Sequence, residues 1–382
     1  MTRTTYLDYN ASAAIRPQAA AAVAHALTLT GNASSVHGFG RRARACLEDA
    51  REAVAALVNA LPSAVVFTSG GTEANNLALR GLAQEGRRVL VSAGEHPSVL
   101  GAVDDAAQVP LGPDGVIDLA RLEERLASDT RPALVSVMLA NNETGVIQPL
   151  DAVVALARRH GALVHCDAVQ AVGKIAVDMT GLGVDALSVS AHKIGGPQGV
   201  GALVAAESLV LAPLLRGGGQ ERRRRAGTEN LPGIAGFGAA AALAVADLDV
   251  SPGDSPRIAA MRDDLERRLR EFAPEVTVVG AEAPRLPNTS CVAVPGLTAE
   301  TLVMGLDLAG VAVSAGSACS SGKVAPSHVL SAMGLAEAVV AAAIRVSFGW
   351  ASTSADVDHF IEACGEIYTR RVAAQRLQNP AA

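Results

Sequence analysis

Short apolar runs alternate with segments of helical periodicity between residues 64 and 206. The runs are rich in valine, leucine and alanine and occupy residues 64–69, 88–93, 133–140, 162–167, 186–191 and 201–206. Strands of a parallel sheet covered by helices on both faces have this character, because neither face meets water. Segments between the runs, such as 151–161 with Gly161 as a C-terminal stop, are typical of helices. The pattern predicts an α/β fold with a mostly parallel sheet flanked by helices.

The stretch SPGDSP, residues 251–256, interrupts this alternation. We expect Ser255 to cap a new helix that has Pro256 in its first position. An apolar stripe at helical spacing follows, made of Ile258, Met261, Leu265, Leu269 and Phe272. The break therefore predicts the entry to a second domain.

Composition and charge narrow the range of partners. The formal net charge is −6 and only 3% of residues are aromatic, which argues against direct binding of nucleic acid or an anionic membrane. The N-terminus has no signal-peptide pattern, and no apolar run approaches the ~20 residues of a membrane span. The five cysteines, at positions 46, 166, 291, 319 and 364, lack the spacing of a disulfide framework or zinc ribbon. We expect a cytoplasmic protein with reduced thiols.

The segment DALSVSAHKIGGPQGVGALV, residues 185–204, contains the most informative lysine. Lys193 stands at the end of a predicted strand and before a glycine-rich turn. A solvated loop lysine is the ordinary alternative. A desolvated lysine with a lowered pKa would instead form a Schiff base with an aldehyde, and this chemistry implies pyridoxal phosphate.

Pyridoxal phosphate needs a phosphate site and a partner for its ring nitrogen. The turn Gly70-Gly71-Thr72 opens a predicted helix whose bare N–H groups suit a phosphate, although plain strand–helix turns share this pattern. Asp167 ends a predicted strand one βα unit before Lys193 and suits a protonated ring nitrogen, with a helix cap as the alternative. A metal site at residues 165–167 is disfavoured, because adjacent strand residues point to opposite faces.

Two further strand ends carry candidate polar groups. His96, in SAGEHPSVL, could stack on the cofactor ring and exchange protons, but a helix-capping or core histidine explains it equally well. Asn142, in ANNETG, is available to the cofactor hydroxyl or the substrate. Cys319 lies in SAGSACSSG, where tiny side chains hold a thiol within reach of solvent but cannot pack around it.

These motifs together resemble those of the cysteine desulfurases, pyridoxal-phosphate enzymes with the aspartate aminotransferase fold. The matching segments cover nearly the whole chain in order: YLDYNASAA, GNASSVHGFGRRAR, FTSGGTEANNLAL, EHPSVL, NNETGVIQP, DAVQAVGK, SAHKIGGPQGVGAL, GGGQERRRRAGTEN, SAGSACSSG, PSHVL and IRVSFG. The resemblance implies a large cofactor-binding domain of residues 13–253 with a seven-stranded, mostly parallel sheet. It also implies a smaller α+β domain of residues 1–12 and 254–382 that carries a mobile cysteine loop.

The resemblance implies a role for each matching residue. Lys193 would form the Schiff base, His96 would be the stacked acid/base, and Cys319 the nucleophile. The implied cofactor ligands are Gly71, Thr72, Asp167, Gln170, Ser190, His192 and Thr228, and the implied substrate ligands are Asn142 and Arg345, with no metal. Among these, Gln170 would bind the phenolic oxygen of the cofactor. Thr228 would contact the phosphate of the neighbouring subunit, which implies a homodimer.

The implied reaction converts L-cysteine to L-alanine and leaves the sulfur on Cys319 as a persulfide. The persulfide would pass to an acceptor, such as an iron–sulfur scaffold protein or a thiolation pathway. A selenocysteine lyase or related pyridoxal-phosphate lyase is the alternative, and a non-catalytic descendant would usually have lost Lys193, Asp167 or Cys319.

The arginine run and the remaining cysteines lie outside the implied site. The run 222–225 is richer in arginine than the family pattern, which commonly has a glycine within it, and is either a solvated face or a docking patch. Cys166 and Cys291 are expected in the core, and Cys46 and Cys364 as packing residues in helices.

Overall fold

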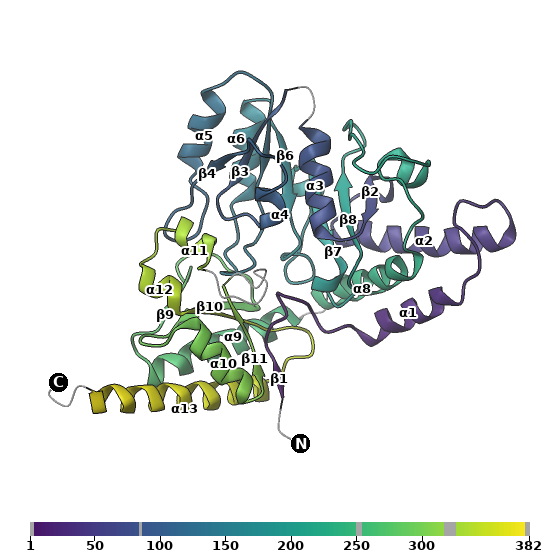
Figure 1. Ribbon diagram of the computed structural model, residues 1–382. Helices are drawn as coiled ribbons and strands as arrows, with labels where there is room; N and C mark the ends of the chain where they lie inside the picture. Colours follow the sequence, from purple (N-terminus) through teal and green to yellow (C-terminus); the bar gives the residue numbers. More distant parts are fainter. Residues whose placement is uncertain (1–3, 84–85, 250–253, 317–325, 379–382) are drawn as a thin grey trace.

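The computed structural model describes residues 4–83, 86–249, 254–316 and 326–378. Figure 1 shows two layered units. A central sheet with helices on both sides forms the upper unit, and a smaller group of helices and strands lies below it, with the long helix α13 along its lower edge.

The upper unit is built on a seven-stranded sheet with the order β2-β8-β7-β6-β5-β3-β4. Its strands are β2 (Val65–Thr68), β3 (Arg88–Ser92), β4 (Ala107–Val109), β5 (Ala133–Ser136), β6 (Leu163–Asp167), β7 (Ala186–Ser190) and β8 (Gly201–Ala205). Strands β3 to β7 pair in parallel, and β8 runs antiparallel to both β2 and β7. The predicted mostly parallel sheet is confirmed. The sequence pattern missed only β4 in this sheet, a three-residue edge strand that is too short to form an apolar run.

Helices cover both faces of this sheet (Figure 1). They are α1 (Pro17–Leu27), α2 (Gly38–Leu57), α3 (Gly71–Leu82), α4 (Pro97–Leu100), α5 (Leu119–Ala127), α6 (Leu150–Arg159), α7 (Met179–Leu182) and α8 (Leu231–Asp249). Helix α6 is the predicted helix of residues 151–161, and Gly161 follows it in the left-handed conformation expected of a stop (φ +63°).

The lower unit has its own apolar core. Its helices are α9 (Asp254–Phe272), α10 (Ala299–Leu308), α11 (His328–Ala332), α12 (Glu337–Ala342) and α13 (Ser354–Gln378). Its strands are β1 (Thr5–Tyr6), β9 (Thr277–Val278), β10 (Thr289–Ala293), β11 (Val311–Ala312), β12 (Ser314–Ala315) and β13 (Ala343–Ser347). Strands β12, β13, β10 and β9 form an antiparallel sheet, and β1 pairs in parallel with β11. The core includes Leu7 from the N-terminal segment. This separate core supports the proposed domain boundaries at residues 13–253, which stay a proposal.

Helix α9 carries the predicted apolar stripe, but its start differs from the prediction. Ile258, Met261, Leu265 and Leu269 are buried, and Phe272 is partly buried against them. The first helical residue is Asp254, so Ser255 lies within the first turn. The prediction of Ser255 as the cap is wrong, because its hydroxyl donates to the Lys174 carbonyl of the upper unit (3.3 Å).

Helix α8 is more apolar than the sequence analysis recognised. Its window Leu231–Leu248 has the length and composition of a membrane-crossing helix, and half of the window is buried inside the protein. The core helix of a globular protein has the same properties. Here α8 packs against α1 and α2.

A buried ion pair ties α2 to the arginine-rich segment. Glu221 accepts two hydrogen bonds from the Arg51 guanidinium (2.8 and 2.9 Å) and one from the Phe67 N–H (2.8 Å). Residues 221–223 are left-handed, with φ of 44°, 55° and 66°. This backbone favours glycine, yet these positions carry a glutamate and two arginines. The Glu221 contacts therefore hold a strained turn in place.

A buried histidine links three strands of the sheet. His165 in β6 pairs through Nδ1 with Ser136 Oγ of β5 (2.8 Å) and through Nε2 with Ser188 Oγ of β7 (2.9 Å). Its ring is fully buried, and burial lowers its pKa to about 3. The folded protein therefore keeps this imidazole neutral.

The Glu221→Ala substitution is expected to lower the free energy of unfolding by about 3 kcal/mol, because it removes the buried carboxylate that pairs with Arg51 and leaves only the more exposed Glu48 as its ionic partner. Urea denaturation measures the effect. Glu124→Ala is the matched control, since it breaks the exposed pair with Arg121, and should cost less than about 1 kcal/mol. Similar losses in both variants would contradict this role of Glu221.

The free energy of unfolding is expected to fall as the pH drops from about 6.5 towards 3. In this interval the His165 side chain binds a proton in the unfolded chain but not in the folded protein. This difference lowers the free energy of unfolding by about 1.4 kcal/mol per pH unit. His165→Gln should show a shallower loss of stability between pH 6.5 and pH 4.5 in urea titrations, whatever its starting stability. An equal slope in His165→Gln and in the unaltered protein would refute the assignment.

Candidate active site

A cavity of ≈ 380 Å³ opens where the carboxyl ends of β6 and β7 meet the lower unit. It brings together ten of the twelve predicted site residues: Gly71, Thr72, His96, Asn142, Asp167, Gln170, Ser190, His192, Lys193 and Arg345. Its wall also contains Asn10, Asn75, Glu143 and His328, which the sequence analysis missed. Ligands commonly bind at this end of parallel strands, so the geometry marks a binding site.

Lys193 enters the cavity from a short 3₁₀ turn after β7. Its Nζ donates to the backbone carbonyls of Asn10 (2.5 Å) and Ala11 (2.9 Å). Gly195 follows with φ +84°, a conformation that lets the chain turn away directly after the lysine. The amine is therefore fixed by backbone carbonyls of the N-terminal segment.

The N-terminus of α3 forms one end of the cavity. Gly70 stands at its N-cap position with no side-chain cap, and a Cβ on Gly71 would lie 2.9 Å from Val169 Cγ2. Ser190 Oγ and His192 Nδ1 are buried without a hydrogen-bond partner among the described residues. Burial, with the charges of two nearby lysines, lowers the pKa of His192 to about 4. Bare N–H groups and unpaired polar atoms together suit a phosphate.

Asp167 lies deeper in the cavity and is 6% exposed. Its carboxylate accepts from the Val169 N–H (3.0 Å) and from Asn75 Nδ2 (2.7 Å). The first contact lies within the turn after β6, where no helix begins, so it is not the helix cap considered as an alternative. Asp167 also lines the cavity. The sequence could have marked Asn75 as a candidate site residue, because an asparagine inside a helix often has a specific polar partner. The carboxylate is therefore held ready for a cation in the cavity, such as a protonated ring nitrogen.

His96 also fits both of its expected roles. Its Nδ1 caps α4 by accepting from the Ser98 N–H (3.1 Å), and the ring lines the cavity. Burial lowers its pKa, Asp167 opposes this shift, and Lys193 adds to it. The imidazole is therefore neutral near pH 7 and suited to accepting a proton.

Arg345, in β13, closes the cavity from the lower unit. One terminal nitrogen binds Asp8 Oδ1 (2.6 Å) and the other donates to the Asn142 carbonyl (3.1 Å). Its Nε is buried without a partner within the described ranges. A guanidinium in this position suits a carboxylate ligand.

Of the last two predicted site residues, the structure places only Thr228, and it lies outside this cavity. Thr228 is exposed and lines a separate hollow with Glu221 and Arg225. Cys319 falls outside the described residues. The described chain after it is bound to the cavity wall, because Ser327 Oγ donates to Glu143 (2.5 Å) and His328 Nε2 pairs with the Glu95 carbonyl (2.9 Å).

The other cysteines lie in packed surroundings. Cys166, Cys291 and Cys364 are buried, and Cys46 is half-buried in α2. Burial raises the pKa of Cys291 and of Cys364 to about 12, so both stay protonated thiols. No cluster of three or more metal-ligating side chains occurs in the part of the chain that the structure describes.

The arginine run is partly used inside the protein. Arg225 forms an ion pair with Glu73 on α3 (2.9 Å), and Arg222 donates to the Ser63 carbonyl (2.6 Å). Arg222 and Arg225 therefore contribute contacts that stabilise the fold.

Known proteins are similar to this chain in sequence and in fold. The model of the class-V aminotransferase family matches residues 5–360. A cysteine desulfurase of Cereibacter sphaeroides is 44% identical over 94% of this chain and 94% of its own. A solved NifS-like protein of Rickettsia africae superposes with a TM-score of 0.89 at 34% identity, covering 96% of this chain and all of that one.

A second solved structure, SspA in complex with cysteine, has a TM-score of 0.77 at 30% identity, covering 90% of this chain and 99% of that one. A cysteine desulfurase IscS of Dictyoglomus turgidum is 38% identical over 95% of this chain and 94% of its own. Since the matches span nearly the whole chain and agree with the cavity geometry, the chain belongs to the cysteine desulfurases of the class-V aminotransferase family.

Proposed function

We propose that this protein is a pyridoxal-phosphate-dependent cysteine desulfurase, which converts L-cysteine to L-alanine and passes the sulfur through Cys319 to an acceptor. The observation that carries the proposal is the convergence of Lys193, Asp167 and Arg345 on one cavity. Each supplies a group that the reaction needs, and they come from three separate parts of the chain.

The cavity fits pyridoxal phosphate. The N-terminus of α3, Ser190 and His192 would hold the phosphate, Asp167 the ring nitrogen and Gln170 the ring oxygen. Lys193 is the amine available to bond the aldehyde carbon. When bound, the cofactor supplies an electron sink that makes the bonds at the substrate α-carbon easier to break.

The residues of the chain then have defined tasks. Arg345, which lines the cavity, would bind the substrate carboxylate with its guanidinium, while Asp8 keeps the guanidinium in place. Lys193 takes the proton from the α-carbon, and neutral His96 accepts or returns a proton nearby. Asn142 stands at the substrate side of the cavity.

Cys319 completes the reaction as a thiolate nucleophile. Its sulfur attacks the substrate sulfur, so that an S–S bond forms and the substrate carbon–sulfur bond breaks. The electron pair stays with the substrate carbon, which gains a proton and leaves within alanine. The persulfide on Cys319 carries the transferable sulfur.

The final sulfur acceptor is proposed to be a protein, such as an iron–sulfur scaffold. A relative carrying the name IscS is similar over nearly the whole chain. The cytoplasmic location expected from the cysteine pattern stays a prediction.

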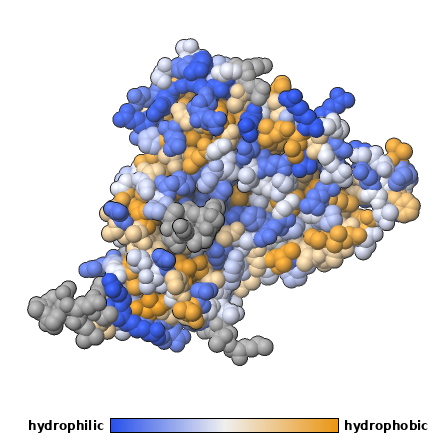
Figure 2. Space-filling model, viewed as in Figure 1, coloured by the Kyte–Doolittle hydropathy of each residue, from blue (hydrophilic) through white to orange (hydrophobic). Residues whose placement is uncertain are grey.

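We further propose that two chains assemble so that Thr228 reaches the phosphate site of its partner. Thr228 is exposed and lies outside the cavity of its own chain. An apolar surface is also present around α1, where Leu27, Val36 and Phe39 are 70%, 88% and 52% exposed. Figure 2 shows apolar residues gathered over this part of the molecule. Such a patch is typical of an interface.

The activity is tested with sulfur-labelled cysteine. The purified holoenzyme should release alanine and retain label on Cys319, and Cys319→Ser should lose the retained label while keeping the visible cofactor band. Lys193→Ala should lose the band that depends on the lysine–cofactor bond. Cys46→Ser is the control thiol and should behave like the unaltered protein. Full sulfur transfer by Cys319→Ser, or an unaltered protein without a cofactor band, would refute the proposal.

The assembly is tested by mixing two inactive or weakened variants. Lys193→Ala and Thr228→Ala should regain activity when refolded together, because one site of a mixed dimer receives neither substitution. Sedimentation of the unaltered protein should give twice the mass of one chain. A monomer, or mixed activity that only equals the sum of the separate variants, would exclude this arrangement.

A further inference from the structure

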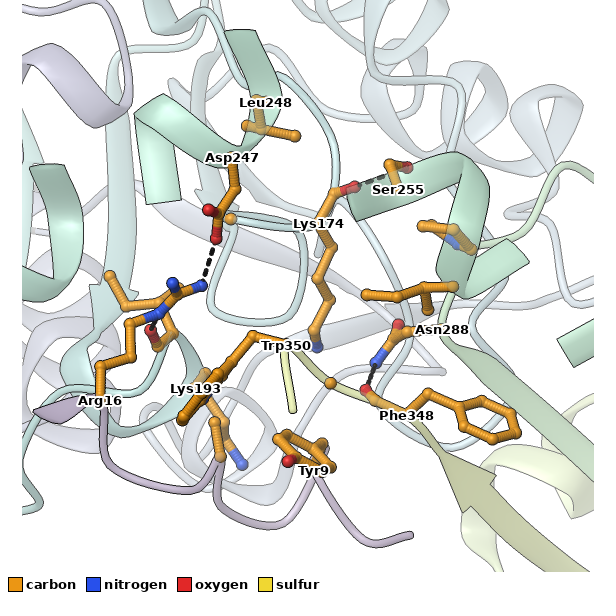
Figure 3. Close-up of a pocket in the computed structure, with 16 residues that line it drawn as sticks. Tyr9, Arg16, Lys174, Lys193, Asp247, Leu248, Ser255, Asn288, Phe348 and Trp350 are labelled. Carbon is orange, nitrogen blue, oxygen red and sulfur yellow. Dashed lines mark hydrogen bonds and ion pairs between the residues drawn. The ribbon is translucent and has the colours of Figure 1, made fainter. Parts of the chain in front are cut away.

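A second buried amine lies directly behind the proposed Schiff-base lysine. Lys174 follows Gln170 by four residues, in the turns after β6, and lines a small cavity of ≈ 50 Å³ together with Lys193 and Asn288. Figure 3 shows this cavity, in which the Lys174 backbone carbonyl binds Ser255 while its side chain extends towards Asn288. The proposed mechanism assigns no task to this amine.

The Lys174 amine is tied to the cavity wall by two amide oxygens. Its Nζ donates to Gln170 Oε1 (2.6 Å) and to Asn10 Oδ1 (3.0 Å). Gln170 Nε2 in turn donates to the Asn10 backbone carbonyl (2.9 Å), which also accepts from Lys193 Nζ. Lys174, Gln170, Asn10 and Lys193 thus form one continuous polar network.

This network decides which way the Gln170 amide faces. A free amide can present either its oxygen or its NH₂ group, because the two ends have the same shape. The ammonium form of Lys174 has no lone pair and can only donate, so it fixes the oxygen end of Gln170. The NH₂ group must then face Asn10, with one remaining N–H for a ligand.

The Asn10 side chain is fixed in the same way. Its Oδ1 accepts from Lys174 and from Asn288 Nδ2 (3.0 Å), and its Nδ2 donates to Thr289 Oγ1 (2.9 Å). With both ends engaged, Asn10 cannot turn to release Lys174. A fully satisfied buried network of this kind specifies a single arrangement.

We propose that Lys174 is a positioning residue that holds Gln170 as a hydrogen-bond donor towards an anionic ring oxygen of the cofactor. The inference rests on the proposed function and deepens it. Without Lys174 the amide can turn its own oxygen towards that anion, which would repel it.

Several charged and titratable groups surround Lys174. Among the described residues they include Lys193, Arg345, the Arg16–Asp247 ion pair, His192 and Tyr9. Burial lowers the pKa of Lys174 well below its ordinary value, and the Lys193 and Arg345 charges lower it further. The positioning role requires the ammonium form, and the amide oxygens of Gln170 and Asn10 favour that form by accepting its N–H groups.

The test measures the visible absorption band of the cofactor-bound enzyme as a function of pH. A hydrogen bond donated to the ring oxygen stabilises the deprotonated form of the bound cofactor. Removing the donor should therefore raise the pH at which the cofactor loses its proton. Lys174→Met and Gln170→Ala should each raise the midpoint of the band titration by about one pH unit, as expected for a hydrogen bond to a charged group. The double variant should shift no further than either single one, because both changes remove the same donor.

Two controls separate positioning from general damage. Ser255→Ala removes the contact to the Lys174 backbone but leaves its amine in place, and should keep the original midpoint. Lys174→Leu is a second replacement without a donor, in case the methionine variant folds poorly, and should also raise the midpoint.

The remaining outcomes are decisive. A shift with Gln170→Ala but not with either Lys174 variant, or additive shifts in the double variant, would overturn the positioning role. An unchanged midpoint in Gln170→Ala would overturn it as well, since Gln170 would then not contact the ring oxygen. Only the absence of a visible band in the unaltered protein would contradict the proposed function itself.

Discussion

The hydrogen bonds of Asn10 are the interaction on which the arrangement of the site depends. This residue is 1% exposed, and its backbone carbonyl accepts from Lys193 and Gln170 of the upper unit. Its backbone N–H and side chain bind Ser347, Thr289 and other groups of the lower unit. A short N-terminal segment therefore joins two separate cores at the point where the reactive lysine emerges. Loss of one of these hydrogen bonds would leave a buried polar group unpaired, which costs about 1–3 kcal/mol for each such group.

The cavity built around this junction is suited to anions. Lys193, Lys174 and Arg345 bring amines and a guanidinium to one region, while burial lowers the pKa of His192 to about 4 and keeps it neutral. Beside Asp167, burial raises the pKa of Glu95 well above its ordinary value, and the Asp167 charge adds to the rise. Burial thus disfavours a second negative charge beside Asp167. A phosphorylated cofactor and a substrate carboxylate both match this distribution of charge.

Much of the fold could be predicted from local pattern. The six apolar runs became six strands of one sheet, since parallel strands covered on both faces must be apolar throughout. The helix over residues 151–161 and the stripe of α9 followed from their periodicity. The start of α9 could not be predicted, because Ser255 bonds a carbonyl of the other unit rather than its own helix. Edge strand β4 was missed since three residues carry too little pattern.

By itself, the sequence determined the kinds of chemistry present: a lysine at a strand end, an uncapped glycine turn, an aspartate at the end of a strand and a cysteine among small residues. Only the tertiary structure decided which of these groups meet, because residues such as Asp8 and Arg345 are neighbours in space and far apart in the chain. It also gave Asn10, Asn75 and Lys174 their roles. Each is an ordinary polar residue by sequence, and its importance comes from burial, where a polar group must find a partner that folding alone supplies.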